Sequence, residues 1–130
     1  MRDWQGQSHV KWYCKYHVVF VPKYRRRAIY GTLRKQIGGI LGELCQRQGV
    51  EIVEGHAMAD HIHLCLSIPP KYSVAHTIGF LKGKSAIRIH RECLGQGRNF
   101  TGLHFWAKGY CVSTVGLDEQ TIVRYIRNQE

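Results

Sequence analysis

The chain has few acidic residues and no long hydrophobic run. Its 130 residues include 9 Asp plus Glu against 19 Lys plus Arg, which gives a formal net charge of +10. No stretch approaches the roughly 18 consecutive apolar residues that cross a bilayer, so we expect no membrane-spanning segment and no membrane partner. The positive excess favours a polyanionic partner, because each Lys or Arg that meets a phosphate can release a condensed counterion. A basic protein without such a partner is the alternative.

The chain also lacks any pair of cysteines at C-x-x-C spacing. Its five cysteines are odd in number, and four of them lie inside apparent strand or helix patterns. This distribution is typical of small buried hydrophobes in a reducing compartment, and it argues against a disulfide framework or a zinc ribbon. The first five residues are polar and lack the apolar centre of a secretion signal. We therefore expect a cytoplasmic protein.

The length and the hydrophobic patterns predict one domain over residues 1–130, with a flexible segment at 1–9. Ser73 is a plausible N-cap for one helix, and Gly49 closes another. The expected strands span 12–21, 50–58, 61–68 and 109–115, and the expected helices span 32–48, 74–92 and 117–130. The order β-α-β-β-α-β predicts an α+β fold of the ferredoxin-like type: a split β-α-β antiparallel sheet with two helices on one face. The last helix follows this unit.

His61-Ile62-His63 lies in a run where apolar residues alternate with polar ones. Such a run predicts a strand with one buried face, so both imidazoles point to the opposite, open face. Two parallel imidazoles can bind a metal ion, and they can also be ordinary polar residues on an open sheet. Of the other histidines, only His17 is expected to share this face, because it follows the aromatic run of the first strand.

The last expected helix carries Tyr125 and Gln129, which are four residues apart and therefore lie on one helix face. A phenol can attack a phosphodiester and leave a covalent phosphotyrosine. A divalent cation, Mg²⁺ or Mn²⁺, bound by His61, His63 and the amide oxygen of Gln129 would draw charge off the phosphate. The alternative is that Tyr125 is a core aromatic residue.

Two clusters of basic residues are candidates for DNA binding. The first lies in a loop that mixes cations with an aromatic ring, which suits backbone phosphates and a stacked base. The second lies on the helix predicted over 74–92. A solvated basic face is the alternative for each residue. The candidates are Lys23, Tyr24, Arg25, Arg26 and Arg27 in the loop, and Lys82, Lys84 and Arg88 on the helix.

These residues together resemble a known family. His61-Ile62-His63 is similar to the HUH motif (His, hydrophobic, His), and Tyr125-Ile126-Arg127-Asn128-Gln129 resembles the single-tyrosine helix that accompanies it. The runs 12–20, 22–26, 81–85 and 105–116 also resemble HUH single-tyrosine transposases of the insertion-sequence-200 type. The resemblance covers about residues 10–129.

The resemblance implies a metal-dependent transposase that works as a homodimer on single-stranded DNA with hairpin ends. It implies that Tyr125 cleaves one strand, keeps the 5′-phosphate and frees a 3′-OH, and that His61, His63 and Gln129 hold the metal. The tyrosine helix of such proteins can serve the partner subunit, and Gly116 would then be a suitable joint. The alternatives are a non-catalytic module that binds single-stranded nucleic acid and a domesticated relative that processes chromosomal palindromes.

Overall fold

A four-stranded antiparallel sheet forms the centre of the molecule. The computed structural model describes residues 5–7, 10–12, 14–94 and 104–115. The sheet contains β3 (Lys15–Phe20), β4 (Glu51–Met58), β5 (His61–Ser67) and β6 (Cys111–Thr114), in the order β4-β5-β3-β6. This is the strand order of the ferredoxin-like fold, so the predicted fold class is confirmed.

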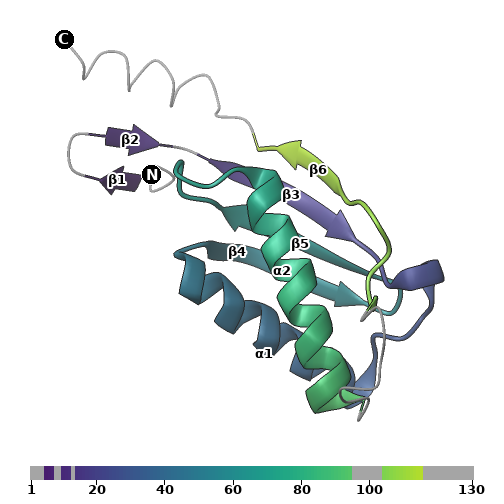
Figure 1. The fold of residues 1–130 in the computed structure, drawn as a ribbon. Coiled ribbons are helices and arrows are strands. Elements are labelled where there is room, and N and C mark those ends of the chain that lie inside the picture. The colour runs from purple at the N-terminus through teal and green to yellow at the C-terminus, as the bar shows by residue number, and fades with distance from the viewer. Residues whose placement is uncertain (1–4, 8–9, 13, 95–103, 116–130) are drawn as a thin grey trace.

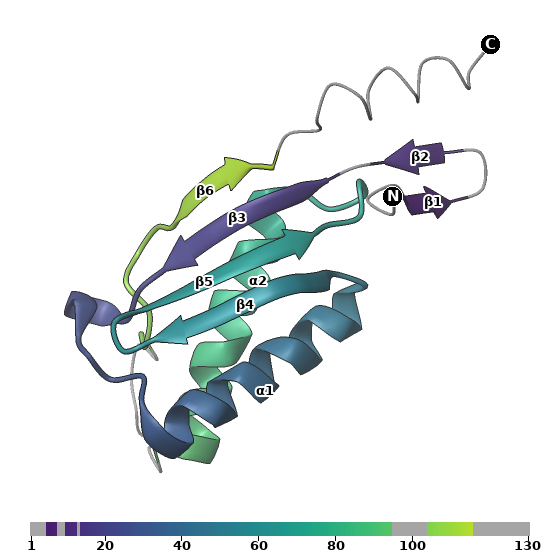
Figure 2. The same ribbon diagram turned by 180° about the vertical axis from the view of Figure 1, so that it is seen from behind.

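Two helices, α1 (Gly31–Gln48) and α2 (Val74–Arg88), cover one face of the sheet (Figure 1). No described helix covers the other face, which is turned toward the viewer in Figure 2. A short 3₁₀ turn, η1 (Lys23–Arg25), follows β3, and a π-helical turn, η2 (Ile89–Cys93), follows α2. None of the helices that the structure describes is long and apolar enough to cross a membrane.

The core fills the layer between the sheet and the helices. Strand β5 alternates as predicted from His61 to Leu64, with Ile62 buried and His61 and His63 partly exposed. Cys65 and Ser67 are buried as well, although the pattern placed them on the open face. The helices bury the stripes that their 3.6-residue period predicts. The buried residues of these elements include Val18, Phe20, Ile37, Leu41, Leu44, Ile62, Leu64, Leu66, Ile78, Leu81 and Ile89.

The helix ends follow the expected capping chemistry. The Ser73 hydroxyl accepts a 2.9 Å hydrogen bond from the backbone N–H of His76, which satisfies one free donor of α2. Gly49 ends α1 with a φ of 68°, a left-handed conformation that costs glycine little. The helix predicted over 74–92 is α-helical only to Arg88 and continues as η2.

The N-terminal segment contains regular structure. Strand β1 (Gln5–Gln7) pairs with β2 (Val10–Trp12) in an antiparallel hairpin. Part of the segment expected to be flexible is therefore a strand. The predicted C-terminal helix over 117–130 lies outside the described residues.

Candidate functional site

Strand β5 carries the two histidines of the His61-Ile62-His63 motif on the uncovered face of the sheet. Between them, the side chain of Ile62 points into the core and is 1% exposed. Both imidazoles remain partly exposed. Because the strand is held on both edges, by β4 and by β3, the spacing of the two rings is fixed by a rigid element.

Strand register brings two further histidines to this face. His56 on β4 lies directly opposite His63, and directly paired residues point to the same side of a sheet. His17 on β3 faces Cys65, two residues along β5 from His63. The ring centroid of His63 lies 5.3 Å from that of His17 and 6.2 Å from that of His56. We call His17, His56, His61 and His63 the histidine face.

A carboxylate fixes one ring of the histidine face. The Oδ1 atom of Asp60 lies 2.9 Å from Nδ1 of His61. This hydrogen bond is the largest cause of the lowered pKa of the Asp60 carboxyl. Desolvation opposes it, and the nearby Arg25 guanidinium adds a smaller lowering. A carboxylate acceptor at Nδ1 leaves the Nε2 lone pair of His61 available to a ligand.

His56 is paired with Glu54 of the same strand. Its Nε2 atom lies 2.8 Å from Oε2 of Glu54, and this hydrogen bond is the largest cause of the lowered pKa of that carboxyl. Sequence reasoning gave no role to either residue, because the pairing that places His56 opposite His63 is not visible in local spacing. One signal was available in the sequence: counting outward along both strands from the Ala59-Asp60 turn pairs His56 with His63.

The histidine face suits a divalent metal that takes two imidazoles and completes its coordination elsewhere. The orientation of His61 by Asp60 is the arrangement found around metal-ligating histidines. Within residues 5–7, 10–12, 14–94 and 104–115, no group of three His, Cys, Asp or Glu side chains is placed to hold a metal ion.

Two predicted site residues, Tyr125 and Gln129, lie outside the described residues. They remain predictions, as does the helix that carries them. Strand β6, which ends at Thr114, pairs with β3 beside the histidine face: Ser113 lies opposite His17. The chain therefore leaves the described structure from the strand next to that face.

The basic loop between β3 and α1 holds two residues in a left-handed backbone conformation. Tyr24 has a φ of 63° and Arg25 a φ of 50°. For residues with a side chain this conformation costs about 1–2 kcal/mol each. Tyr24 is also 82% exposed, so burial does not compensate for this cost. Non-glycine residues in this region cluster at functional sites.

The other cations of this loop are accessible. Arg26 and Arg27 are exposed, and the Lys23 ammonium lies 5.5 Å from the centroid of the Tyr24 ring. Hydrogen bonds from the Lys23 N–H to the Phe105 carbonyl and from the Arg25 N–H to the Pro22 carbonyl, 2.8 and 2.7 Å long, fix the backbone. The loop thus presents several cations and one aromatic ring on a fixed support.

The basic residues of α2 have different environments. Lys82 donates hydrogen bonds to the carbonyls of Ala107 and Gly109, and burial lowers the pKa of its ammonium. Arg88 pairs with Glu43 and Glu92, at 2.8 and 3.1 Å. These two cations already have protein partners.

Lys84 is exposed. Of the three α2 residues predicted to bind DNA, it has the surroundings that suit a phosphate contact best.

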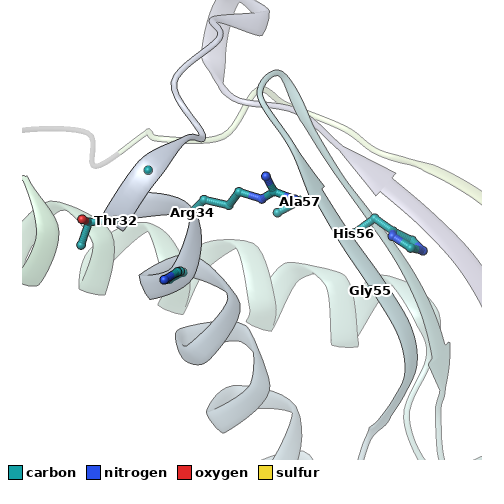
Figure 3. A pocket seen from close by; sticks show the side chains of 7 residues that line it. Thr32, Arg34, Gly55, His56 and Ala57 are labelled. Carbon is teal, nitrogen blue, oxygen red and sulfur yellow. The ribbon is translucent and has the colours of Figure 1, made fainter.

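A hollow lies between the N-terminal end of α1 and strand β4 (Figure 3). Arg34 extends across it toward Ala57, whereas His56 points to the other side of the strand. The hollow therefore lies at the edge of the sheet, and it adjoins the histidine face at His56, which is among its lining residues. It shares Gly31 and Thr32 with a second hollow that Arg26 and Arg27 line. The basic surface of the loop thus continues to Arg34 and Lys35, which the sequence patterns did not single out.

Comparison with known proteins identifies the family. The family model described as "Transposase IS200 like" matches residues 10–129. The chain therefore belongs to the IS200-like transposases. It is 44% identical over 129 residues to the transposase for insertion sequence element IS200 of Salmonella typhimurium, covering 99% of this chain and 85% of the relative. It is 29% identical over 126 residues to the ISDra2 transposase TnpA of Deinococcus radiodurans, covering 96% and 89%.

Solved structures agree with this assignment. A crystal structure of a transposase candidate from Deinococcus radiodurans R1 matches with a TM-score of 0.73 and 28% identity, covering 97% of each chain. A REP-associated tyrosine transposase bound to a REP hairpin matches with a TM-score of 0.60 and 10% identity, covering 91% of this chain and 68% of that one. The second likeness concerns the fold alone. The chain is thus a transposase with the fold of its relatives.

Proposed function

We propose that this transposase cleaves and rejoins single-stranded DNA at the ends of an insertion sequence, with Tyr125 as the nucleophile. The observation that carries the proposal is the pair His61 and His63 within the histidine face: two partly exposed imidazoles on the inner strand β5, one of them oriented by a carboxylate. The neighbouring basic loop presents exposed cations and one aromatic ring, which suit binding of the DNA strand to be cut. Substrates with hairpin ends are proposed by analogy with a fold relative whose structure contains a REP hairpin.

In the proposed reaction the Tyr125 oxygen attacks a backbone phosphorus. The bond from phosphorus to the 3′-oxygen breaks, the 5′-phosphate stays on the tyrosine, and the leaving oxygen takes a proton to become a 3′-OH. A second 3′-OH then attacks the phosphotyrosine and restores the phenol. A free tyrosine has a pKa of about 10, so its proton must pass to a base as the new bond forms.

His61 and His63 would hold the divalent metal, Mg²⁺ or Mn²⁺, together with Gln129. When bound, the metal would act as a Lewis acid on the phosphate. The contribution of the chain itself is orientation: β5 fixes the distance between the rings, and Asp60 fixes the tautomer of His61. The basic loop would bind the flanking backbone, with Tyr24 stacked on a base and the cations at 23 and 25–27 on phosphates. Lys82, Lys84 and Arg88 remain part of the proposed DNA-binding set, with Lys84 the best placed.

The test is incubation with a hairpin-containing single strand and Mg²⁺ or Mn²⁺, followed by denaturing electrophoresis. We expect a covalent protein–DNA adduct that is lost in Tyr125→Phe and retained in Tyr110→Phe, a control at an exposed tyrosine of the described structure. His61→Ala, His63→Ala and Gln129→Ala should each reduce the adduct. Tight binding without any adduct would contradict the proposal and favour a non-catalytic module. Transposition-like joining confined to chromosomal palindromes would indicate a domesticated relative.

A homodimer is also proposed, and subunit mixing tests it. Light scattering gives the mass in solution. A mixture of Tyr125→Phe with His63→Ala subunits should recover cleavage if the tyrosine serves the partner subunit, because one mixed site is then intact. A monomeric mass at working concentration would contradict the dimer. We retain the expectation of a cytoplasmic protein, which rests on the five free cysteines.

A further inference from the structure

One carboxylate connects the basic loop with the histidine face. The Oδ1 atom of Asp60 contacts Nδ1 of His61 at 2.9 Å, and its Oδ2 atom lies 3.5 Å from Nε of Arg25. The two oxygens of Asp60 therefore face two different parts of the proposed site. One of these parts holds a proposed metal ligand, and the other is a proposed contact to the DNA backbone.

The backbone holds this arrangement in place. Arg25 adopts a φ of 50°, and its N–H donates to the carbonyl of Pro22. At the end of the loop, the N–H of Ile29 donates a 3.0 Å hydrogen bond to the carbonyl of Ala59, the residue before Asp60. The loop is thus tied to the turn that leads into β5. A left-handed arginine is an unfavourable choice for a loop, and here it accompanies the contact with Asp60.

The two contacts of Asp60 have opposite effects on a cation at the histidine face. The hydrogen bond to His61 makes Nε2 of that ring a better donor to a metal. The guanidinium of Arg25 withdraws negative charge from the same carboxylate. Arg25 is exposed, with 71% of its side chain accessible, so a DNA phosphate can reach it. When a DNA phosphate pairs with Arg25, the guanidinium no longer withdraws charge from Asp60, and the full negative charge of the carboxylate acts on His61.

We propose that Asp60 is a positioning residue that couples occupation of the basic loop by a DNA strand to the affinity of the histidine face for its divalent cation. The inference rests on the proposed metal role of His61. Because linkage is reciprocal, the cation also strengthens binding of the strand by the same factor. A transposase built in this way binds its cation firmly only when a strand is present.

The test measures Mn²⁺ binding by the loss of the free-ion electron paramagnetic resonance signal. The full chain carries Tyr125→Phe to prevent cleavage, and it is titrated with and without an oligothymidylate of 20 nucleotides. Without DNA, Asp60→Asn should weaken Mn²⁺ binding by about 10–100-fold, the usual cost of removing an outer-shell partner. With DNA, binding to the Tyr125→Phe parent should tighten by about fivefold or more.

Two arginine variants separate coupling from general attraction. Arg25→Ala should abolish the effect of DNA on the Mn²⁺ affinity and should tighten DNA-free binding. Arg47→Ala removes an exposed cation at the C-terminal end of α1, outside the proposed DNA-binding set, and should leave the effect in place. The oligonucleotide also binds Mn²⁺ itself, and its titration with His61→Ala protein gives that background.

The outcomes distinguish this inference from the proposed function. If His61→Ala binds Mn²⁺ as the parent does, the proposed metal site is wrong. If His61→Ala loses Mn²⁺ while Asp60→Asn retains it, the metal site stands and the role of Asp60 is wrong. If Asp60→Asn does not fold, the two arginine variants decide: an equal effect of DNA on Mn²⁺ binding in Arg25→Ala and Arg47→Ala overturns the coupling.

Discussion

The Nε2 atom of His63 lies 3.3 Å from the Nδ1 atom of His17, which is 46 residues earlier in the chain. Their rings are tilted by 44°, and each belongs to a different strand of the sheet. The second histidine of the His61-Ile62-His63 motif thus has an imidazole partner, as the first has a carboxylate partner. Both rings of the motif are oriented by neighbours.

The first prediction concerns this pair. His17→Phe keeps a ring of similar shape and removes the nitrogen that faces His63. We expect Mn²⁺ binding to weaken by about tenfold, because an outer-shell partner of a ligand is lost. Isothermal titration calorimetry measures the change. His56→Phe is the matched control: His56 lies opposite His63 but is hydrogen-bonded to Glu54, so its loss should change the affinity little. Equal effects of the two substitutions would contradict a specific role of His17.

The second prediction separates two lysines of α2. Lys82→Met removes the donor to the carbonyls of Ala107 and Gly109 and should lower the free energy of unfolding by about 1 kcal/mol, the usual size for a partly exposed bond. Lys84→Met alters an exposed side chain and should change stability by less than about 0.5 kcal/mol. Urea unfolding measures both. Fluorescence anisotropy with a single-stranded oligonucleotide should show weaker binding for Lys84→Met. Unchanged binding would remove Lys84 from the DNA-binding set.

The third prediction concerns a buried hydrogen bond that joins α2 to the segment before β6. The indole N–H of Trp106 donates to the hydroxyl of Ser85 at 2.9 Å, and Ser85 is fully buried. Ser85→Ala leaves that N–H without its acceptor, which costs about 1–3 kcal/mol. We expect an earlier urea midpoint with an unchanged slope. Ser113→Ala, at an exposed position on β6, should keep the midpoint, and a matching shift there would contradict the assignment.

The sequence predicted the elements of this fold well because its local signals are strong. Alternation over 61–68 marked the buried and open faces of β5, and Ser73 and Gly49 marked helix ends. The change of α2 into η2 at Ile89 was not predicted, because a helical pattern continues through both. The strand order followed from a known motif and not from any local signal, since antiparallel pairing across the sheet joins residues far apart in the chain.

The site was less predictable for the same reason. His61 and His63 were visible because they are neighbours on one strand, whereas the approach of His17 to His63 depends on the register between β3 and β5. The contacts of Lys82 with the Ala107 carbonyl and of Arg88 with Glu43 likewise depend on the tertiary structure. A count of basic residues measures charge, and it does not show which cations already have partners.

The fourth prediction concerns the strained loop. Asparagine adopts the left-handed conformation more readily than other residues with a side chain. Tyr24→Asn should therefore raise the free energy of unfolding by about 0.5 kcal/mol. This is a net value, because relief of the backbone strain exceeds the loss of the contact between Lys23 and the Tyr24 ring. The same change removes a stacking ring worth about 1–3 kcal/mol per base, so affinity for single-stranded DNA should fall about tenfold. Thermal unfolding and anisotropy measure the two effects.

Two controls accompany the Tyr24 substitution. Tyr24→Phe should retain both the stability and the affinity of the parent. Tyr110→Asn changes another exposed tyrosine, which lies outside the left-handed region, and should give no gain in stability. If Tyr24→Asn weakens the fold, the backbone strain at this position is not relieved by asparagine and the account of the loop is wrong.

The last prediction concerns salt. If the basic loop and the surface that continues to Arg34 and Lys35 make about six phosphate contacts, the affinity for a single strand should fall by two to three decades between roughly 50 and 200 mM salt. Removal of one contact by Arg27→Ala should make the slope of log affinity against log salt shallower by about 0.7. Arg47→Ala removes an equal charge from the other end of α1 and should leave the slope unchanged. Equal slopes for the two variants would show that net charge, and not this surface, binds the strand.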